Sequence, residues 1–341
     1  MRKFIQGCGV ALAMSLFAVN AQAQTPDAQT ALCSQGNGDA SIAACSAIIA
    51  AGQVKGAELS AIYYGRGMAH EALKQYGLAV LDYNEAVTLK SDSREAAFNE
   101  SVACNYFDRL FLPGGTQAAD TPAPENAQAF HLCGNSYSRK EQNDVALRNY
   151  DQSISLDPQN AIAYLDRANT KNRLGQTDHA LDDYNKSVEL KPTPSALINR
   201  GTIYGERRQY PQAMADYDAG LKLQPGALPG LNDRCFTRAV MGQELDKALA
   251  DCTEALRLSP NFVNAMTSRG FVYFRMGNFA AAIADFDATL KINPNSAAAY
   301  YMRGLTKIKT GDRSGSDRDI SRARELDRKI AEWYAGYGVK P

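Results

Sequence analysis

Small residues, aromatic residues and prolines recur among polar positions at intervals of about 34 residues along most of the chain. The run RGFVYFRMGNFAAAIADFDATLKINP (269–294) is one copy, with a glycine near its start and Asn-Pro at its end. Small residues let facing helices approach closely, and proline interrupts helical hydrogen bonding and so ends each unit. The pattern therefore predicts a repeated pair of helices whose glycines pack helices and hold no phosphate. The aligned residues are Gly67, Gly134, Ala168, Gly201, Gly270 and Gly304, then Ala79, Ala146, Ala180, Ala213, Ala248 and Ala282, then the aromatics Tyr83, Tyr150, Tyr184, Tyr217 and Phe286, and the closing prolines Pro158, Pro192, Pro225, Pro260 and Pro294.

This pattern resembles the tetratricopeptide repeat, in which two antiparallel helices occupy about 34 residues. The resemblance covers roughly residues 60–330 and implies an all-α, right-handed α-solenoid of stacked helical hairpins. The predicted segments are a signal peptide (1–23), an N-terminal segment with a capping helix (24–59), repeats at 60–93, 127–160, 161–193, 194–228, 229–262, 263–296 and 297–330, a half repeat with a Pro/Gly-rich loop (94–126) and a C-terminal tail (331–341).

Two stretches depart from the repeat. After a first helix that ends near Arg109, the run LFLPGGTQAADTPAPE has five Pro and Gly residues where a second helix belongs, and predicts an exposed loop. A spacer is favoured over a functional loop there. Residues 24–38 are polar and predicted to be loose, whereas 39–52 predict a helix that caps the apolar end of the stack.

An arginine precedes the small residue in five copies, and an aspartate follows it by sixteen positions. In a hairpin that turns midway, these two positions face each other across the helices. Regular spacing favours structural pairs over a catalytic or phosphate-binding array, and we expect exposed pairs that contribute about 0–1 kcal/mol each. The copy around Cys235 has Asp251 but no aligned arginine, although Arg234 is adjacent. The pairs are Arg66–Asp82, Arg167–Asp183, Arg200–Asp216, Arg269–Asp285 and Arg303–Asp319.

The N-terminal run MRKFIQGCGVALAMSLFAVNAQAQ has two basic residues, a short apolar core and an A-x-A site ending at Ala23. These features predict a secretory signal cleaved after Ala23, and hence an exported protein that is periplasmic or secreted. A short membrane anchor is the less favoured alternative, because the apolar core is about half as long as a bilayer span. No later stretch predicts a transmembrane segment.

Six of the seven cysteines remain once Cys8 is removed with the signal. An even number in an oxidising compartment favours disulfides, and free buried cysteines are the alternative. Cys235 and Cys252 occupy facing positions of one helical pair, where a bond would contribute about 3 kcal/mol. The predicted bonds are Cys33–Cys45, Cys104–Cys133 and Cys235–Cys252.

The sequence offers no candidate catalytic or metal site. Its 37 basic and 37 acidic residues give no electrostatic argument for nucleic acid binding. Common hydrolase, metalloprotease and phosphate-loop motifs do not occur, and His70, His131 and His179 are far apart in the repeat. We therefore predict no enzyme, cofactor or metal, and expect Trp333 to pack against the last repeat.

The resemblance implies a concave groove, lined by first helices, that binds a protein or peptide. The residues predicted to face it are asparagines and arginines at repeated positions. An asparagine amide can donate to and accept from a peptide backbone, and arginine can hold a carboxylate at two points. Lysines typical of carboxylate clamps are missing, which argues against a C-terminal carboxylate as ligand, and ordinary solvated polar residues are the alternative. The residues are Asn135, Arg139, Asn169, Arg173 and Asn199, with Asn99 nearby.

Toward the C-terminal end the predicted groove becomes apolar, with Phe271, Phe274, Tyr301 and Leu305. Such a patch suits a hydrophobic anchor pocket or self-association. We predict a non-catalytic exported scaffold that binds proteins or peptides. The alternative is a glycan-binding or structural envelope module with stacking platforms at Tyr64, Phe98, Phe271 and Tyr301.

Overall fold

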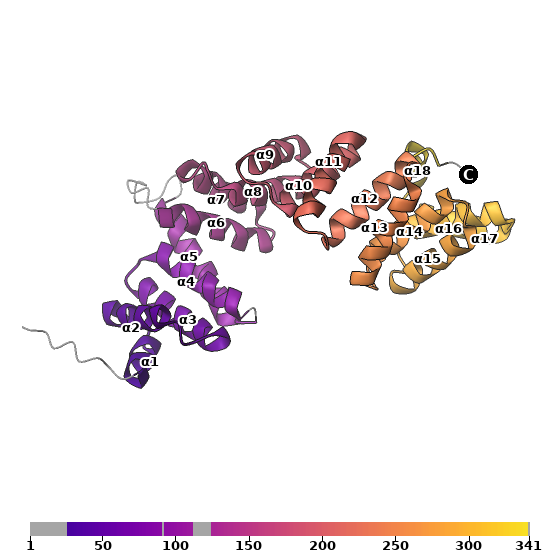
Figure 1. Ribbon diagram of the computed structural model, residues 1–341. Coiled ribbons are helices and arrows are strands. Elements are labelled where there is room, and N and C mark those ends of the chain that lie inside the picture. Colours follow the sequence, from indigo (N-terminus) through magenta and orange to yellow (C-terminus); the bar gives the residue numbers. More distant parts are fainter. Residues whose placement is uncertain (1–25, 91, 112–123, 340–341) are drawn as a thin grey trace, which may run out of the picture. The chain divides into compact units, whose positions relative to one another are not determined.

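Helical hairpins form the structure throughout the residues that the computed structural model describes, which are 26–90, 92–111 and 124–339 (Figure 1). Within these ranges all regular secondary structure is α-helical, so the prediction of an all-α stack of hairpins is confirmed. The predicted signal peptide and most of the predicted loop lie outside the described residues. The helices are α1 (Pro26–Ser34), α2 (Gly38–Ala51), α3 (Gly56–Ala72), α4 (Tyr76–Leu89), α5 (Arg94–Phe111), α6 (Pro124–Arg139), α7 (Asn143–Leu156), α8 (Ala161–Arg173), α9 (Thr177–Leu190), α10 (Pro194–Glu206), α11 (Tyr210–Leu223), α12 (Leu228–Met241), α13 (Leu245–Leu258), α14 (Val263–Arg275), α15 (Phe279–Ile292), α16 (Ala297–Thr310), α17 (Arg313–Leu326) and α18 (Ile330–Gly336).

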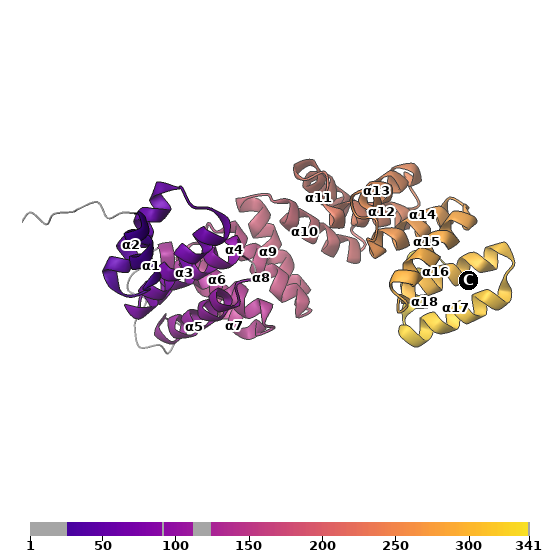
Figure 2. The same ribbon diagram turned by 90° about the horizontal axis from the view of Figure 1, so that it is seen from below.

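The chain divides into two units, residues 1–120 (unit 1) and 121–341 (unit 2). Unit 1 contains the pairs α1–α2 and α3–α4, with α5 packed on α4. Unit 2 contains six hairpins among its described residues, from α6–α7 to α16–α17, each packed on the next in chain order (Figure 2). The final helix, α18, packs on α16 and α17.

Glycine and an aromatic ring make the closest contact within several hairpins. A Cβ atom added to Gly134 would lie 2.5 Å from the Tyr150 ring, and one added to Gly270 would lie 2.6 Å from the Phe286 ring. Both rings are almost completely buried. The spacing of small and aromatic positions therefore sets how closely the two helices of a hairpin approach.

The α12–α13 hairpin replaces this contact with a disulfide. Cys235 and Cys252 are bonded, with Cα atoms 5.7 Å apart. The sequence alignment of this copy was off by one position, because α12 has 14 residues whereas α10 and α14 have 13. With that extra residue, Arg234 pairs with Asp251 as in the other copies. Cys235 then occupies the glycine position, and Cys252 occupies the aromatic position.

The arginine–aspartate pairs are more buried than the sequence analysis assumed. Arg167 donates two hydrogen bonds of 2.6 and 2.8 Å to Asp183, whose side chain is only 6% exposed. Its remaining amino group donates to Asp151 on α7 at 2.6 Å. Arg234 and Arg303 likewise join their own hairpins to the preceding ones through Asp218 and Asp287. Bidentate charged hydrogen bonds are stronger and more specific than single exposed ion pairs.

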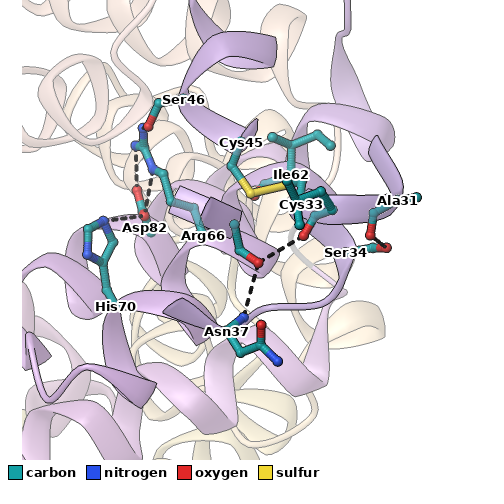
Figure 3. The surroundings of a disulfide bond; sticks show 12 residues. Ala31, Cys33, Ser34, Asn37, Cys45, Ser46, Ile62, Arg66, His70 and Asp82 are labelled. Carbon is teal, nitrogen blue, oxygen red and sulfur yellow. Dashed lines mark hydrogen bonds and ion pairs between the residues drawn. A yellow bond between two sulfur atoms is a disulfide. The ribbon is translucent and has the colours of Figure 1, made fainter. Parts of the chain in front are cut away.

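Unit 1 begins with a helix where the sequence predicted a loose segment. Residues 26–34 form α1, which is joined to α2 by the Cys33–Cys45 disulfide (Figure 3). Cys33 is 1% exposed, and a Cβ added to Gly65 of α3 would lie 2.9 Å from the Cys33 carbonyl oxygen. The bond and this close approach hold α1 against α2 and α3, which the polar composition of residues 24–38 did not predict.

Cys104 and Cys133, the third predicted pair, are both completely buried. They belong to different units, and their bond stays a prediction.

In the part of the chain that the structure describes, no helix combines the length and apolar character needed to cross a membrane.

Candidate functional site

Unit 2 has a polar depression of about 390 Å³ on helices α6, α7 and α8. It brings together four of the residues predicted to face a groove, because they occupy matching positions of neighbouring repeats. We call this site the polar depression. It is lined by Asn135, Ser138, Arg139, Tyr150, Asp166, Asn169, Thr170 and Arg173.

The asparagines of the depression are held by buried tyrosines. The Tyr150 hydroxyl donates to Asn135 Oδ1 at 2.7 Å, and the Tyr184 hydroxyl donates to Asn169 Oδ1 at 2.7 Å. Burial raises the pKa of both Tyr150 and Tyr184 to about 12, so both remain protonated donors at neutral pH. Asn169 Oδ1 also accepts from Asn199 Nδ2 at 2.9 Å. The carbonyl oxygens are therefore engaged within the protein, and the amide nitrogen of Asn169 is the group open to a partner.

Arg173 is positioned by neighbours from two other helices. Its guanidinium donates to the side chain of Ser138 on α6 and to Asn143 Oδ1 on α7 at 3.3 Å. The residue itself is exposed, as is Arg139. The depression thus presents arginine charge from a fixed position, which suits recognition of a carboxylate.

A histidine–aspartate pair lies beside the predicted residues and was missed. His131 Nε2 is 2.7 Å from Asp166 Oδ2 and 3.4 Å from Asn135 Nδ2. The two paired residues are 35 positions apart. That separation is close to one repeat, so comparing adjacent copies position by position could have found the pair.

Asn99 belongs to unit 1, outside the polar depression. Its Nδ2 donates to the Tyr64 hydroxyl at 3.1 Å.

The predicted apolar patch is not open to a partner, because α18 covers it. Phe271 is 1% exposed and Tyr301 is fully buried, and both contact the Tyr334 ring with centroids 5.9 and 5.4 Å away. Phe274 is half-buried and lies against the Phe279 ring. The prediction of an anchor pocket here was therefore wrong, since the C-terminal tail packs against α14 and α16.

The same burial removes support for the glycan alternative. Two of its four stacking platforms, Phe271 and Tyr301, have no exposed ring face. Trp333 was expected to pack against the last repeat, yet it is 57% exposed. Ile330 and Tyr334 supply the buried face of α18 instead.

Comparison with known proteins shows that the chain contains tetratricopeptide repeats. Models described as Tetratricopeptide repeat match residues 60–93, 134–195 and 263–296. Such repeats generally form non-catalytic scaffolds for binding proteins or peptides. Among the curated proteins compared with the chain, none matches it.

Several solved structures share the fold at low sequence identity. A tetratricopeptide repeat protein from Parabacteroides merdae ATCC 43184 has a TM-score of 0.54 and 21% identity, covering 78% of this chain and 100% of its own. A chain of the APC/C hetero-tetramer Cut9–Hcn1 has a TM-score of 0.55 and 14% identity, covering 84% and 77%. Pseudomonas aeruginosa pilF has a TM-score of 0.51 and 16% identity, covering 62% and 98%. These similarities establish the fold.

Proposed function

We propose that the protein is an exported, non-catalytic scaffold whose polar depression binds an extended segment of a partner protein. The row of oriented polar side chains at Asn135, Asn169 and Arg173 carries this proposal. Because these groups are held in place before binding, a partner segment docks at little ordering cost to the scaffold. The arginines favour a segment with acidic side chains.

Export is the second part of the proposal. The signal-like N-terminus and the disulfides Cys33–Cys45 and Cys235–Cys252 support it, because such bonds persist mainly in oxidising compartments. Cell fractionation, with sequencing of the N-terminus of the purified protein, tests it directly. A protein that begins at Gln24 supports export, whereas an uncleaved chain in the cytoplasmic fraction contradicts it.

Site-specific photo-crosslinking in intact cells tests the binding surface. A crosslinking residue replaces exposed Asn172, next to Arg173, and a control crosslinker replaces exposed Asp182 on α9. We expect partner bands from position 172 only. We also expect Arg173→Ala in the same chain to reduce those bands at least fivefold.

Arg207→Ala is the matched control for the loss of an arginine. Arg207 is also exposed, but it pairs with Asp178 outside the depression. It should leave the crosslinks unchanged. Equal capture from positions 172 and 182, or bands that survive Arg173→Ala in a folded chain, would show that the depression is not the binding surface.

A further inference from the structure

A second cavity lies further along unit 2, between α10, α11 and α12, with a volume of about 240 Å³. Two carboxyl groups, Glu206 and Asp233, and four aromatic rings line it. The rings come from distant parts of the chain, since the last one follows α18. We call this cavity the acidic aromatic pocket. Its rings are Tyr210, Tyr217, Phe236 and Tyr337.

At the pocket α10 carries smaller residues than α8 carries at the matching positions. Thr202 stands at the position of Asn169, and Gly205 stands at the position of Asn172. A Cβ added to Gly205 would already lie 3.3 Å from the Tyr217 hydroxyl. These small side chains leave room between α10 and α12 in the pocket.

Tyr217 lines this space, and Thr202 stands where an asparagine faces the matching tyrosines of other repeats. Tyr150 and Tyr184, at the same repeat position, each donate to an asparagine oxygen. Tyr217 is only 2% exposed, and it lines the pocket. Its polar neighbours are the hydroxyls of Thr202 and Thr237. The three hydroxyls in the pocket wall can each donate to or accept from a polar ligand atom.

Among the described residues, neither carboxyl group forms a hydrogen-bonded ion pair, unlike the aspartates that face the repeat arginines. Asp233 accepts hydrogen bonds of 2.9 Å from Thr202 Oγ1 and from Asn232 Nδ2, both neutral donors. Burial raises the pKa of Asp233, and burial together with the charge of Asp233 raises the pKa of Glu206.

Two arginines lie near the pocket, and both have other neighbours. Arg207 pairs with Asp178, and its charge partly offsets the rise in the pKa of Glu206. The Arg208 guanidinium lies against Gly336. The pocket therefore carries two carboxyl groups flanked by aromatic rings, with Asp233 inside it and Glu206 at its exposed edge. Aromatic faces and carboxylates both attract cations, and the attraction increases when water is excluded.

We propose that the acidic aromatic pocket binds a protonated primary amine or guanidinium group. Either a lysine or arginine side chain of a partner segment or a free alkylamine supplies this chemistry. The carboxyl groups pair with the cation, and the rings cover its alkyl stem. This inference does not depend on ligand binding at the polar depression.

Ligand-observed NMR titrations of the full-length protein test the proposal. The probes are butylamine, the peptide acetyl-Ala-Ala-Lys-Ala-amide, and the same peptide with norleucine, which keeps the apolar stem and lacks the charge. We expect butylamine and the lysine peptide to bind, and the norleucine peptide to bind at least tenfold more weakly. Tighter binding of the lysine peptide than of butylamine identifies a protein segment as the source, and the reverse identifies a small amine.

Variants locate the binding. Glu206→Gln changes an exposed side chain and should weaken lysine-peptide binding at least threefold, and adding Asp233→Asn should weaken it more than tenfold. Gly205→Leu should fill the pocket and abolish binding. Glu332→Gln, an exposed acid on α18 outside the pocket, is the matched control and should have no effect. Equal affinity for the norleucine peptide, or unchanged affinity in folded Glu206→Gln protein, would overturn the proposal.

Discussion

At the scale of residues, glycine determines how closely the helices of several hairpins pack, because it leaves room for a neighbouring ring. Gly134, Gly201 and Gly270 each leave space for one face of an aromatic ring from the second helix. Ala168 occupies the same position in α8, where it is completely buried. The methyl group of alanine therefore fits at this repeat position in α8, whereas in α6, α10 and α14 it would lie too close to the ring.

We predict that Gly270→Ala destabilises the protein by about 1 kcal/mol. The added Cβ would lie 2.6 Å from the Phe286 ring, and overpacking typically costs about 1–3 kcal/mol. Alanine regains up to about 1 kcal/mol of helix propensity, which offsets part of this cost. Urea unfolding followed by circular dichroism measures the difference.

Gly205→Ala is the matched control, because the new methyl group would face the acidic aromatic pocket. Its nearest neighbour would be the Tyr217 hydroxyl at 3.3 Å. This variant should be neutral or slightly stabilising. If both variants change stability equally, ring contact does not explain the repeated spacing of glycine and aromatic residues along this chain.

Residue spacing predicted which side chains gather in the polar depression, but it did not predict their hydrogen bonds. Asn135 and Asn169 repeat in register, so their proximity follows from the 34-residue spacing. Their hydrogen bonds to Tyr150 and Tyr184 depend on rotamers that spacing does not determine. The acidic aromatic pocket was missed because its wall includes Tyr337, which comes from the tail outside the repeat and so has no repeat position.

At the scale of elements, the α12–α13 hairpin exchanges a packing contact for a covalent bond. Cys235 and Cys252 stand where Gly201 and Tyr217 stand in the preceding hairpin. The arginine–aspartate pair keeps the two helices in register in both hairpins. These two positions therefore bring the helices of a hairpin into close contact, through either a glycine–ring contact or a disulfide.

We predict that Cys235→Ala with Cys252→Ala lowers the free energy of unfolding by about 3 kcal/mol. Cys235→Gly with Cys252→Tyr should recover at least half of that loss, because it restores the contact used by the preceding hairpin. Unfolding curves with and without reductant measure both effects. Equal stability of the two double variants would mean that the positions are not equivalent.

The helices at the two ends show where sequence periodicity is insufficient. The hairpins from α6 to α17 arise from contacts close in sequence, so the repeat pattern predicts them. The packing of α18 and the residues after it on α12, α14 and α16 depends on contacts between residues far apart in the sequence. One example is Tyr337 with Phe236, whose ring centroids are 5.5 Å apart. A tail outside the repeat gives no register from which such contacts could be inferred.

At the scale of the whole molecule, unit 2 ends in a cap built from its own tail. In a stack of repeats each hairpin depends on its neighbours, so the last one needs a partner for its apolar face. Tyr334 is 5% exposed and contacts rings from α14 and α16. Arg275 adds a hydrogen bond of 2.6 Å to the Tyr337 carbonyl oxygen.

We predict that Tyr334→Ala destabilises the C-terminal hairpins by about 3 kcal/mol or more, by analogy with removal of other buried aromatic side chains. Hydrogen exchange should accelerate in α14–α17 and remain unchanged in α6–α9, because coupling in a repeat stack passes between neighbours. Trp333→Ala, which removes the adjacent exposed ring, should change stability by less than about 0.5 kcal/mol. Similar losses in the two variants would contradict the capping role of Tyr334.

The Cys235–Cys252 bond also makes one part of the array respond to the thiol balance of its surroundings. Reduction breaks the covalent link between α12 and α13 and leaves two thiol side chains where the preceding hairpin has the packing of a glycine against a tyrosine ring. Because α12 also supplies Asp233 and Phe236, the loosened helix would distort the proposed amine pocket as well. Maturation of that pocket is thereby tied to oxidation, so a newly made chain in a reducing environment would hold amines poorly until the bond closes.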